Sequence, residues 1–131
     1  MCGIAFSGKT TVAKQLSQAL GCAYVSLDSI NAERGLHGGE GLAVEEWERT
    51  HAVARVRIKE LMARSEDVVL DDTNCFRWLR DCYRASAEEN GYSAELVYLD
   101  VPLQEVHARM IQNSRTAGRH SIEAHVFDEH V

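Results

Sequence analysis

One glycine-bearing stretch near the start of the chain constrains its fold more than any other feature. Residues 3–10 read GIAFSGKT, and the residues that follow, up to Gly21, carry apolar side chains at helical spacing. Glycines let backbone N–H groups turn inward around an anion, and the helix that follows points the positive end of its dipole at the same place. The stretch therefore predicts an anion-binding loop between a buried strand and a helix, as found in α/β folds.

Only Met1 and Cys2 stand before this loop. The strand that feeds such a loop lies in the interior of a parallel sheet and takes about five or six residues. A misplaced start, a fragment, or a sheet completed by another segment or chain would each account for so short a lead. We favour truncation, with that strand missing, and we expect the exposed sheet to permit self-association.

Strand-like and helix-like segments alternate along the rest of the chain. The predicted strands are continuous apolar runs, which is typical of a parallel sheet covered by helices on both faces. We therefore predict a three-layer α/β fold in which polar residues gather at the carboxyl ends of the strands. The predicted strands are 22–28, 67–72 and 94–102, and the predicted helices are 9–20, 44–63, 78–90 and 103–113. Residues 35–41 read as a flexible glycine-rich loop, and the inward-facing residues of helix 44–63 are Trp47, Ala54, Ile58 and Leu61.

Composition is that of an ordinary globular protein. The 131 residues suffice for one domain, taken here as residues 1–131, with 45% hydrophobic and 26% charged residues. No apolar run approaches the roughly 20 residues of a membrane helix, and the four cysteines show no metal-type spacing. We therefore expect a cytoplasmic protein with reduced cysteines and no membrane partner. The net charge of −6 opposes indiscriminate binding to nucleic acid.

The loop fits the pattern G-x-x-x-x-G-K-[ST], which is rare by chance in a chain of this length. In that pattern the lysine, Lys9, reaches the β- and γ-phosphates of a nucleotide, and the hydroxyl of Thr10 ligates Mg²⁺. The stretch therefore predicts ATP and Mg²⁺ as ligands. The predicted nucleotide-binding residues are Gly3, Ser7, Gly8, Lys9, Thr10 and Thr11.

Acidic residues follow two of the predicted strands. Asp28, opposite the loop, is placed to act as a general base toward an attacking hydroxyl, or else to cap the helix that begins near it. Asp71 and Asp72 close an apolar strand, a pattern typical of a carboxylate that holds Mg²⁺. Because side chains alternate along a strand, only one of these two acids points at the site, and ordinary loop capping is the alternative for the pair.

Arginines lie near both ends of the predicted site. Arg109, Arg115 and Arg119 lie on or beyond helix 103–113, where an arginine on a lid (residues 114–121) would neutralise a transferring phosphoryl group. Arg77 and Arg80 follow Thr73-Asn74 and would grip the phosphate of a phosphorylated substrate. For both groups a solvated basic surface is the alternative. The six histidines have no ligand-like spacing and read as solvated or core residues.

Taken together, the loop, Asp28, the run "DDTN", the run "YLDVP" and the trailing arginines resemble a known group. The chain is similar to the small P-loop kinases related to zeta-toxin kinases, chloramphenicol phosphotransferase and the kinase domain of 5′-polynucleotide kinases, which are often described as AAA-family proteins. Family loops often carry Pro and Gly where this chain has Ala5 and Phe6. The family also continues beyond the lid into a part that helps to enclose adenine, whereas this sequence stops at Val131.

The resemblance implies a role for each matching residue. Lys9 is the phosphate-binding lysine, Asp28 is the catalytic base, and Arg115 and Arg119 match the lid arginines. Asp72, the aspartate directly before Thr-Asn, is assigned with Thr10 to the metal. The implied substrate-binding residues are Thr73, Asn74 and Arg77.

The predicted function is phosphoryl transfer from ATP. The γ-phosphoryl of Mg-ATP would pass to an acceptor hydroxyl of a small molecule or of a nucleic acid 5′-end, and the transition state needs neutralised charge more than covalent help. The alternative is a nucleotide-binding module, or an ATPase without kinase activity. Substitution of Asp28 separates these functions, because only a kinase has transfer activity to lose.

Overall fold

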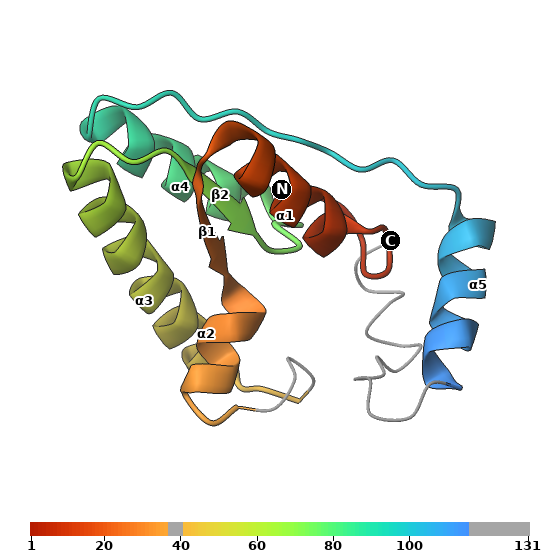
Figure 1. Ribbon diagram of the computed structural model, residues 1–131. Helices are drawn as coiled ribbons and strands as arrows, with labels where there is room; N and C mark the ends of the chain where they lie inside the picture. Colours follow the sequence, from red (N-terminus) through yellow and green to blue (C-terminus); the bar gives the residue numbers. More distant parts are fainter. Residues whose placement is uncertain (37–40, 116–131) are drawn as a thin grey trace.

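The computed structural model describes residues 1–36 and 41–115 (Figure 1). Helices precede, separate and follow two parallel strands, and the α/β class predicted from the sequence is confirmed. Helix α3 has the bounds that the sequence predicts. The elements are α1 (Lys9–Leu20), β1 (Ala23–Ser26), α2 (Leu27–Glu33), α3 (Val44–Ala63), β2 (Val68–Asp71), α4 (Arg77–Glu89) and α5 (Leu103–Ser114).

The two strands form a parallel pair with helices on both faces. The register pairs Ala23 with Val68 and Ser26 with Asp71. Along β1 the side chains alternate: the Tyr24 ring lies under Lys14 of α1, with Nζ 5.9 Å from the ring centroid, whereas Val25 packs in the cluster that includes residues of α3. The sheet therefore separates α1 from α3, as a doubly covered parallel sheet requires.

The predicted strand over 94–102 is wrong as a strand. Residues 92–102 run as an extended connection from α4 to α5 (Figure 1). Within the described residues their β-type pairing consists of one isolated parallel bridge, between Tyr98 and Cys2. The Cys2 N–H donates to the Val97 oxygen at 2.8 Å, and the Leu99 N–H donates to the Cys2 oxygen at 3.0 Å. A strand needs a partner strand, and here the partner residues turn into the loop at Gly3.

Met1 and Cys2 occupy the interior position that we expected for the strand feeding the loop. On one side the Met1 nitrogen donates to the Leu70 oxygen of β2 at 2.8 Å, and on the other side Cys2 pairs with Tyr98. The spatial order is therefore β1, β2, Met1-Cys2, and then the segment around Tyr98. This order places the start of the loop at the centre of the described structure.

The main core lies between the sheet and helices α2 and α3. Leu27, Ile30 and Ala54 are fully buried there, and burial of a large aliphatic side chain contributes about 1.5–3 kcal/mol. The predicted inward face of α3 is confirmed, because the residues that pack in or against this cluster include Trp47, Ala54, Ile58 and Leu61.

A polar network joins α2 to α3 above this core. Arg34 donates to the Thr50 hydroxyl at 2.6 Å and pairs with Glu46 at 2.5 Å. The Thr50 hydroxyl in turn donates to the Asn31 side-chain oxygen at 2.5 Å. Buried polar groups that are paired in this way fix the position of α2, the helix that carries Asp28.

Two further expectations concern helix ends and loops. Gly21 ends α1 in the left-handed conformation (φ 67°), as predicted, and its N–H donates to the Ser17 oxygen. In the predicted loop 35–41, Gly35 and Gly41 have φ 76° and 70°, and residues 37–40 lie outside the described residues. In the described part of the chain no helix is both long and apolar enough to cross a membrane.

Candidate active site

The loop over residues 3–8 leads directly into the first turn of α1. Gly8 stands at the N-cap with φ 94° and, as a glycine, has no side chain with which to cap the helix. The first N–H groups of an α-helix have no partner within the helix, so this end of α1 presents free donors and the positive end of the helix dipole. An anion held in the loop would receive both.

Gly3 and Ser7 show how tightly the loop is folded. A side chain at Gly3 would place its Cβ 3.0 Å from the Ser7 hydroxyl and 3.1 Å from the Leu99 oxygen, so only glycine fits at φ 147°. The Ser7 hydroxyl is buried and has no hydrogen-bond partner in the described part of the chain. A buried hydroxyl without a partner is costly, and a bound phosphate oxygen would satisfy it.

Lys9 lies within reach of the loop and of three acids. Its Nζ donates to the Ile4 oxygen at 2.7 Å. Burial lowers the pKa of Lys9, and the negative charges of Asp71, Asp72 and Asp28, in that order of strength, oppose the shift. Polar residues from three separate parts of the sequence therefore act on one ammonium group, as the predicted convergence at the strand ends requires.

The two adjacent acids have different surroundings. Asp71 is buried, and the Tyr24 hydroxyl donates to its Oδ2 at 2.6 Å. Asp72 is half-buried, and its Oδ2 accepts the N–H of Asn74 at 3.3 Å. Asp71 acts more strongly than Asp72 on Lys9, although the resemblance assigned Asp72 to the metal. Asp71 is therefore a second candidate for that role, and the assignment of Asp72 stays a prediction.

Asp72 also lies near a pair of residues that join α3 to α4. His51 Nδ1 and the Tyr83 hydroxyl are 2.8 Å apart. Burial lowers the pKa of His51 and raises that of Tyr83, and the charge of Asp72 raises both. Sequence reasoning gave His51 no partner, because the contact depends on how two helices pack and no spacing in the sequence reveals it.

Asp28 lies in the first turn of α2 and is exposed. The cap of this helix is Ser26, whose hydroxyl oxygen accepts the Ser29 N–H at 3.3 Å. The alternative in which Asp28 caps the helix is therefore wrong. Its carboxylate acts on Lys9, so it remains a candidate for the catalytic base.

The segment Thr73-Asn74 braces the entry to the loop. The Thr73 oxygen accepts the Gly3 N–H at 3.3 Å, and the Asn74 side chain, which is buried, donates to the Met1 oxygen at 2.8 Å. Asn74 has φ 46°, a left-handed conformation that asparagine tolerates. These contacts give Asn74 a structural task besides the predicted contact with substrate.

Arg77 and Arg80 of α4 differ in surroundings. Arg80 donates to the oxygens of Asn74 and Cys75, at 2.6 and 2.9 Å, and so holds the same segment. The Arg77 side chain is 88% exposed and lies 3.7 Å from Asp81 on the same helix. The predicted grip of Arg77 on a substrate phosphate stays a prediction.

Arg109 of α5 reaches the loop. Its Nη1 donates to the Phe6 oxygen at 3.1 Å and would lie 3.6 Å from a Cβ built at Gly8, while its Nη2 pairs with Glu105. Arg115 follows the last residue of α5. Arg119 and residues 116–121 of the predicted lid lie outside the described residues. Arg109 is therefore the lid-region arginine that the structure brings to the loop.

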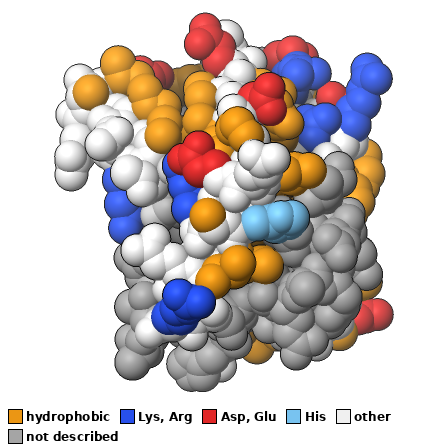
Figure 2. Space-filling model, turned by 90° about the vertical axis from the view of Figure 1, so that its right-hand side faces the viewer, with side chains coloured by type: hydrophobic (Ala, Val, Ile, Leu, Met, Phe, Trp, Pro, Cys, Tyr) orange, Lys and Arg blue, Asp and Glu red, His pale blue; other side chains and the backbone are white. Residues whose placement is uncertain are grey.

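The face around α5 carries both signs of charge. Figure 2 shows Lys and Arg side chains interspersed with Asp, Glu and hydrophobic ones on the coloured part of this face. The coloured part of this face is therefore not uniformly basic. Individual cations such as Lys9 and Arg109 contact the loop instead.

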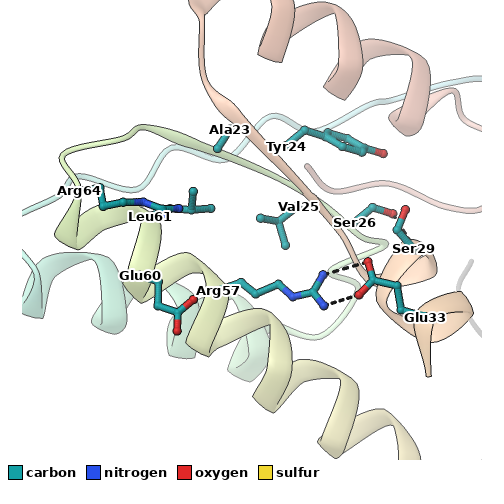
Figure 3. A pocket seen from close by; sticks show the side chains of 10 residues that line it. All are labelled: Ala23, Tyr24, Val25, Ser26, Ser29, Glu33, Arg57, Glu60, Leu61 and Arg64. Atoms are coloured by element: carbon teal, nitrogen blue, oxygen red, sulfur yellow. Dashed lines mark hydrogen bonds and ion pairs between the residues drawn. The ribbon is translucent and has the colours of Figure 1, made fainter.

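Two hollows lie near the sheet. One, of about 300 Å³, adjoins the loop and is lined by residues that include Gly3, Ile4, Thr73 and Arg80. The other, of about 290 Å³, runs along the outer edge of β1 and contains no loop residue (Figure 3). Its wall holds the ion pair of Arg57 with Glu33.

The residues at the loop suit a magnesium ion that is shared with phosphate. In the described part of the chain no three His, Cys, Asp or Glu residues gather into an all-protein metal site. Mg²⁺ commonly takes only one or two protein oxygens and completes its shell with water and substrate phosphates. Thr10 in the first turn of α1 and an acid at the end of β2 meet that need.

Comparison with known proteins gives both a family and a fold. A sequence profile described as AAA domain matches residues 1–130, and a search of curated proteins gives no match. A gluconokinase from Sinorhizobium meliloti 1021 superposes with a TM-score of 0.65 at 23% identity, over 98% of this chain and 69% of that one.

Two further structures are similar. A chain of the Pnkp1/Rnl/Hen1 RNA repair complex has a TM-score of 0.81 at 20% identity, over 99% of this chain and 41% of that one. The Mycobacterium tuberculosis APS kinase CysC, in complex with AMPPNP and APS, has a TM-score of 0.59 at 20% identity, over 82% of this chain and 64% of that one. The chain therefore belongs to the AAA domain family and has the fold of the small P-loop kinases.

Proposed function

We propose that this protein is an ATP-dependent kinase that transfers the γ-phosphoryl group of Mg-ATP to an acceptor hydroxyl. The observation that carries the proposal is the surroundings of Lys9: a half-buried ammonium at the loop, near the carboxylates of Asp71, Asp72 and Asp28. Burial destabilises the charged form of an ammonium group, and a phosphate bound beside it would stabilise that form again. Of the carboxylates near Lys9, one would hold the metal ion and another would accept the proton of the acceptor hydroxyl.

The phosphates would lie in the loop. The N–H groups at the start of α1, the Ser7 hydroxyl and Lys9 would bind the β- and γ-phosphates. Thr10, with Asp72 or Asp71, would hold Mg²⁺, which supplies positive charge against the phosphate oxygens when bound. Arg109, Arg115 and Arg119 would add charge to the transferring group from the α5 side.

Asp28 would act as the general base. It is exposed at the start of α2, so an acceptor hydroxyl has access to it from solvent, and it is near enough to Lys9 to affect its pKa. A carboxylate within hydrogen-bond reach accepts the hydroxyl proton as the oxygen attacks phosphorus. Thr73 and Arg77 would contact the acceptor.

The acceptor class is a small hydroxylated molecule or a nucleic acid 5′-end. Among the similar structures are a gluconokinase, an APS kinase and a chain of an RNA repair complex, which supports both classes. The net charge of −6 favours the small molecule, although an enzyme that binds only an end contacts few phosphates. A cytoplasmic location fits such a substrate.

Transfer from γ-labelled ATP to panels of small-molecule hydroxyls and of nucleic acid 5′-ends tests the proposal. We expect Asp28→Asn to lower turnover by roughly two to four orders of magnitude while leaving ATP affinity within about twofold. Asp67→Asn is the matched control and should change neither turnover nor ATP affinity. Asp67 is an exposed acid directly before β2, at the other end of that strand from Asp71. Bound ATP with no transfer in any arm would instead identify a nucleotide-binding module, and release of phosphate to water alone an ATPase.

A further inference from the structure

Phe6 adopts a backbone conformation that does not suit it. Its φ is 59°, in the left-handed region, which costs free energy for a bulky side chain such as that of phenylalanine. Such strain persists only when surrounding contacts outweigh it, so an outlier of this kind inside a binding loop indicates a task for the side chain.

The Phe6 side chain packs against α5. It belongs to a cluster around the buried residues Ala5 and Val106, together with Val101 and Met110. Val106 and Met110 lie one turn apart on α5 and therefore present one face to the loop. The aromatic ring thus makes part of the apolar contact between the loop and this helix.

The Phe6 backbone binds the same helix. Its carbonyl oxygen accepts a hydrogen bond from Nη1 of Arg109 at 3.1 Å. Arg109 lies one turn beyond Val106 on α5, and its Nη2 pairs with Glu105 on the same helix. In Figure 1 α5 stands apart from α3 and α4 and beside the loop end of α1. The loop is therefore a principal support of α5 within the described structure.

We propose that Phe6 is a positioning residue, which holds α5 against the phosphate loop and so keeps the Arg109 guanidinium at the phosphates of the nucleotide. The inference rests on the proposed function. Lys9 and Arg109 donate to neighbouring loop carbonyls, those of Ile4 and Phe6. A phosphate in the loop offers both cations a charged acceptor in place of a carbonyl, and charge-assisted hydrogen bonds are the stronger kind.

A double-mutant cycle on Mg-ATP affinity, measured by calorimetry, tests this role. We expect Arg109→Ala to weaken binding roughly tenfold, the loss of about one charge-assisted hydrogen bond. Phe6→Ala should weaken it roughly three- to tenfold, and the double variant should bind no worse than Arg109→Ala alone. Additive losses, or a Phe6→Ala variant that binds as the wild type does, would overturn the proposal.

Other substitutions separate positioning from strain and from general instability. Phe6→Leu, which keeps an apolar side chain, should restore most of the affinity. Phe6→Gly relieves the strained backbone and also removes the aromatic side chain. If Phe6 acts only through backbone strain, this variant should bind Mg-ATP as well as the wild type or more tightly. If Phe6 positions α5, it should bind Mg-ATP more weakly. Ile111→Ala removes an exposed apolar side chain from α5 and is the matched control that should bind normally.

Two readouts keep the outcomes distinct. Amide exchange over residues 103–114 should be faster in Phe6→Ala than in the wild type, while α1 and α3 keep their protection. Lys9→Ala tests the phosphate site itself: if it binds Mg-ATP normally, the proposed function fails. If Lys9→Ala loses binding and the Phe6 series has no effect, only the positioning role fails.

Discussion

Asp71 is buried at the end of β2, and the Tyr24 hydroxyl donates a hydrogen bond to it. Burial first, and the contact with Asp71 second, raise the pKa of Tyr24, so the phenol remains a neutral donor at physiological pH. A buried carboxylate without hydrogen bonds is costly. Tyr24 therefore supports an acid that acts on Lys9 without itself belonging to the loop.

We predict that Tyr24→Phe lowers the free energy of unfolding by about 1–3 kcal/mol, because a buried acceptor loses its donor. Urea unfolding followed by circular dichroism measures the change. Tyr98→Phe is the matched control: Tyr98 is 60% exposed, so its loss of hydroxyl should cost less than about 0.5 kcal/mol. Equal effects of the two substitutions would contradict a supporting role for Tyr24.

At the residue scale the sequence predicted which residues gather near the loop better than it predicted their contacts. The loop motif and the acids after the strands led to Lys9 and Asp28, because strand ends in a parallel sheet meet at one edge. The bonds of Tyr24 to Asp71 and of Arg109 to Phe6 join residues far apart in the chain. No periodicity encodes such pairs, since they depend on how finished elements pack.

At the scale of elements, helices were predictable because their signals are local. The apolar residues of α3 recur three and four positions apart, which predicts its inward face. Gly21 ends α1 because glycine readily adopts the left-handed backbone conformation. The segment 94–102 is as rich in β-branched and aromatic residues as a strand. A strand, however, also requires a partner, and Cys2 supplies a single bridge.

The contact between α3 and α4 makes stability depend on pH. Burial lowers the pKa of His51 below its ordinary value of 6.5, against the opposing charge of Asp72 and with the charge of Arg55. In the folded protein the imidazole therefore stays neutral where the unfolded chain binds a proton. Since the unfolded state binds more protons, stability from this group falls as pH drops below about 6.5.

We predict that His51→Gln, which cannot gain a proton, loses less stability than the wild type between about pH 7 and about pH 5. Urea midpoints at several pH values measure the difference. His107→Gln removes an exposed histidine of α5 and controls for the loss of a histidine as such. Parallel pH profiles for wild type and His51→Gln would show that His51 titrates alike in both states.

At the scale of the whole molecule the sheet brings distant segments to one loop. The residues that surround the loop come from Met1-Cys2, from the end of β2, from α2 and from α5, so the site depends on most of the fold. A ligand bound there contacts several elements at once. Binding should therefore stabilise the chain against global unfolding as well as order the loop.

We predict that Mg-ATP raises the melting temperature of the wild type, and that Lys9→Ala abolishes the rise while melting normally without ligand. Ligand at about 100 times its Kd adds about 2.7 kcal/mol to the stability of the folded state, which corresponds to roughly 8–10 °C for a chain of this size. Differential scanning fluorimetry with and without Mg-ATP measures the shift. Asp28→Asn should keep the full shift, because a base that acts on the acceptor does not hold the nucleotide. A shift of the same size in Lys9→Ala would mean that the nucleotide binds elsewhere, since the lysine that faces the loop carbonyls would then contribute nothing to its affinity.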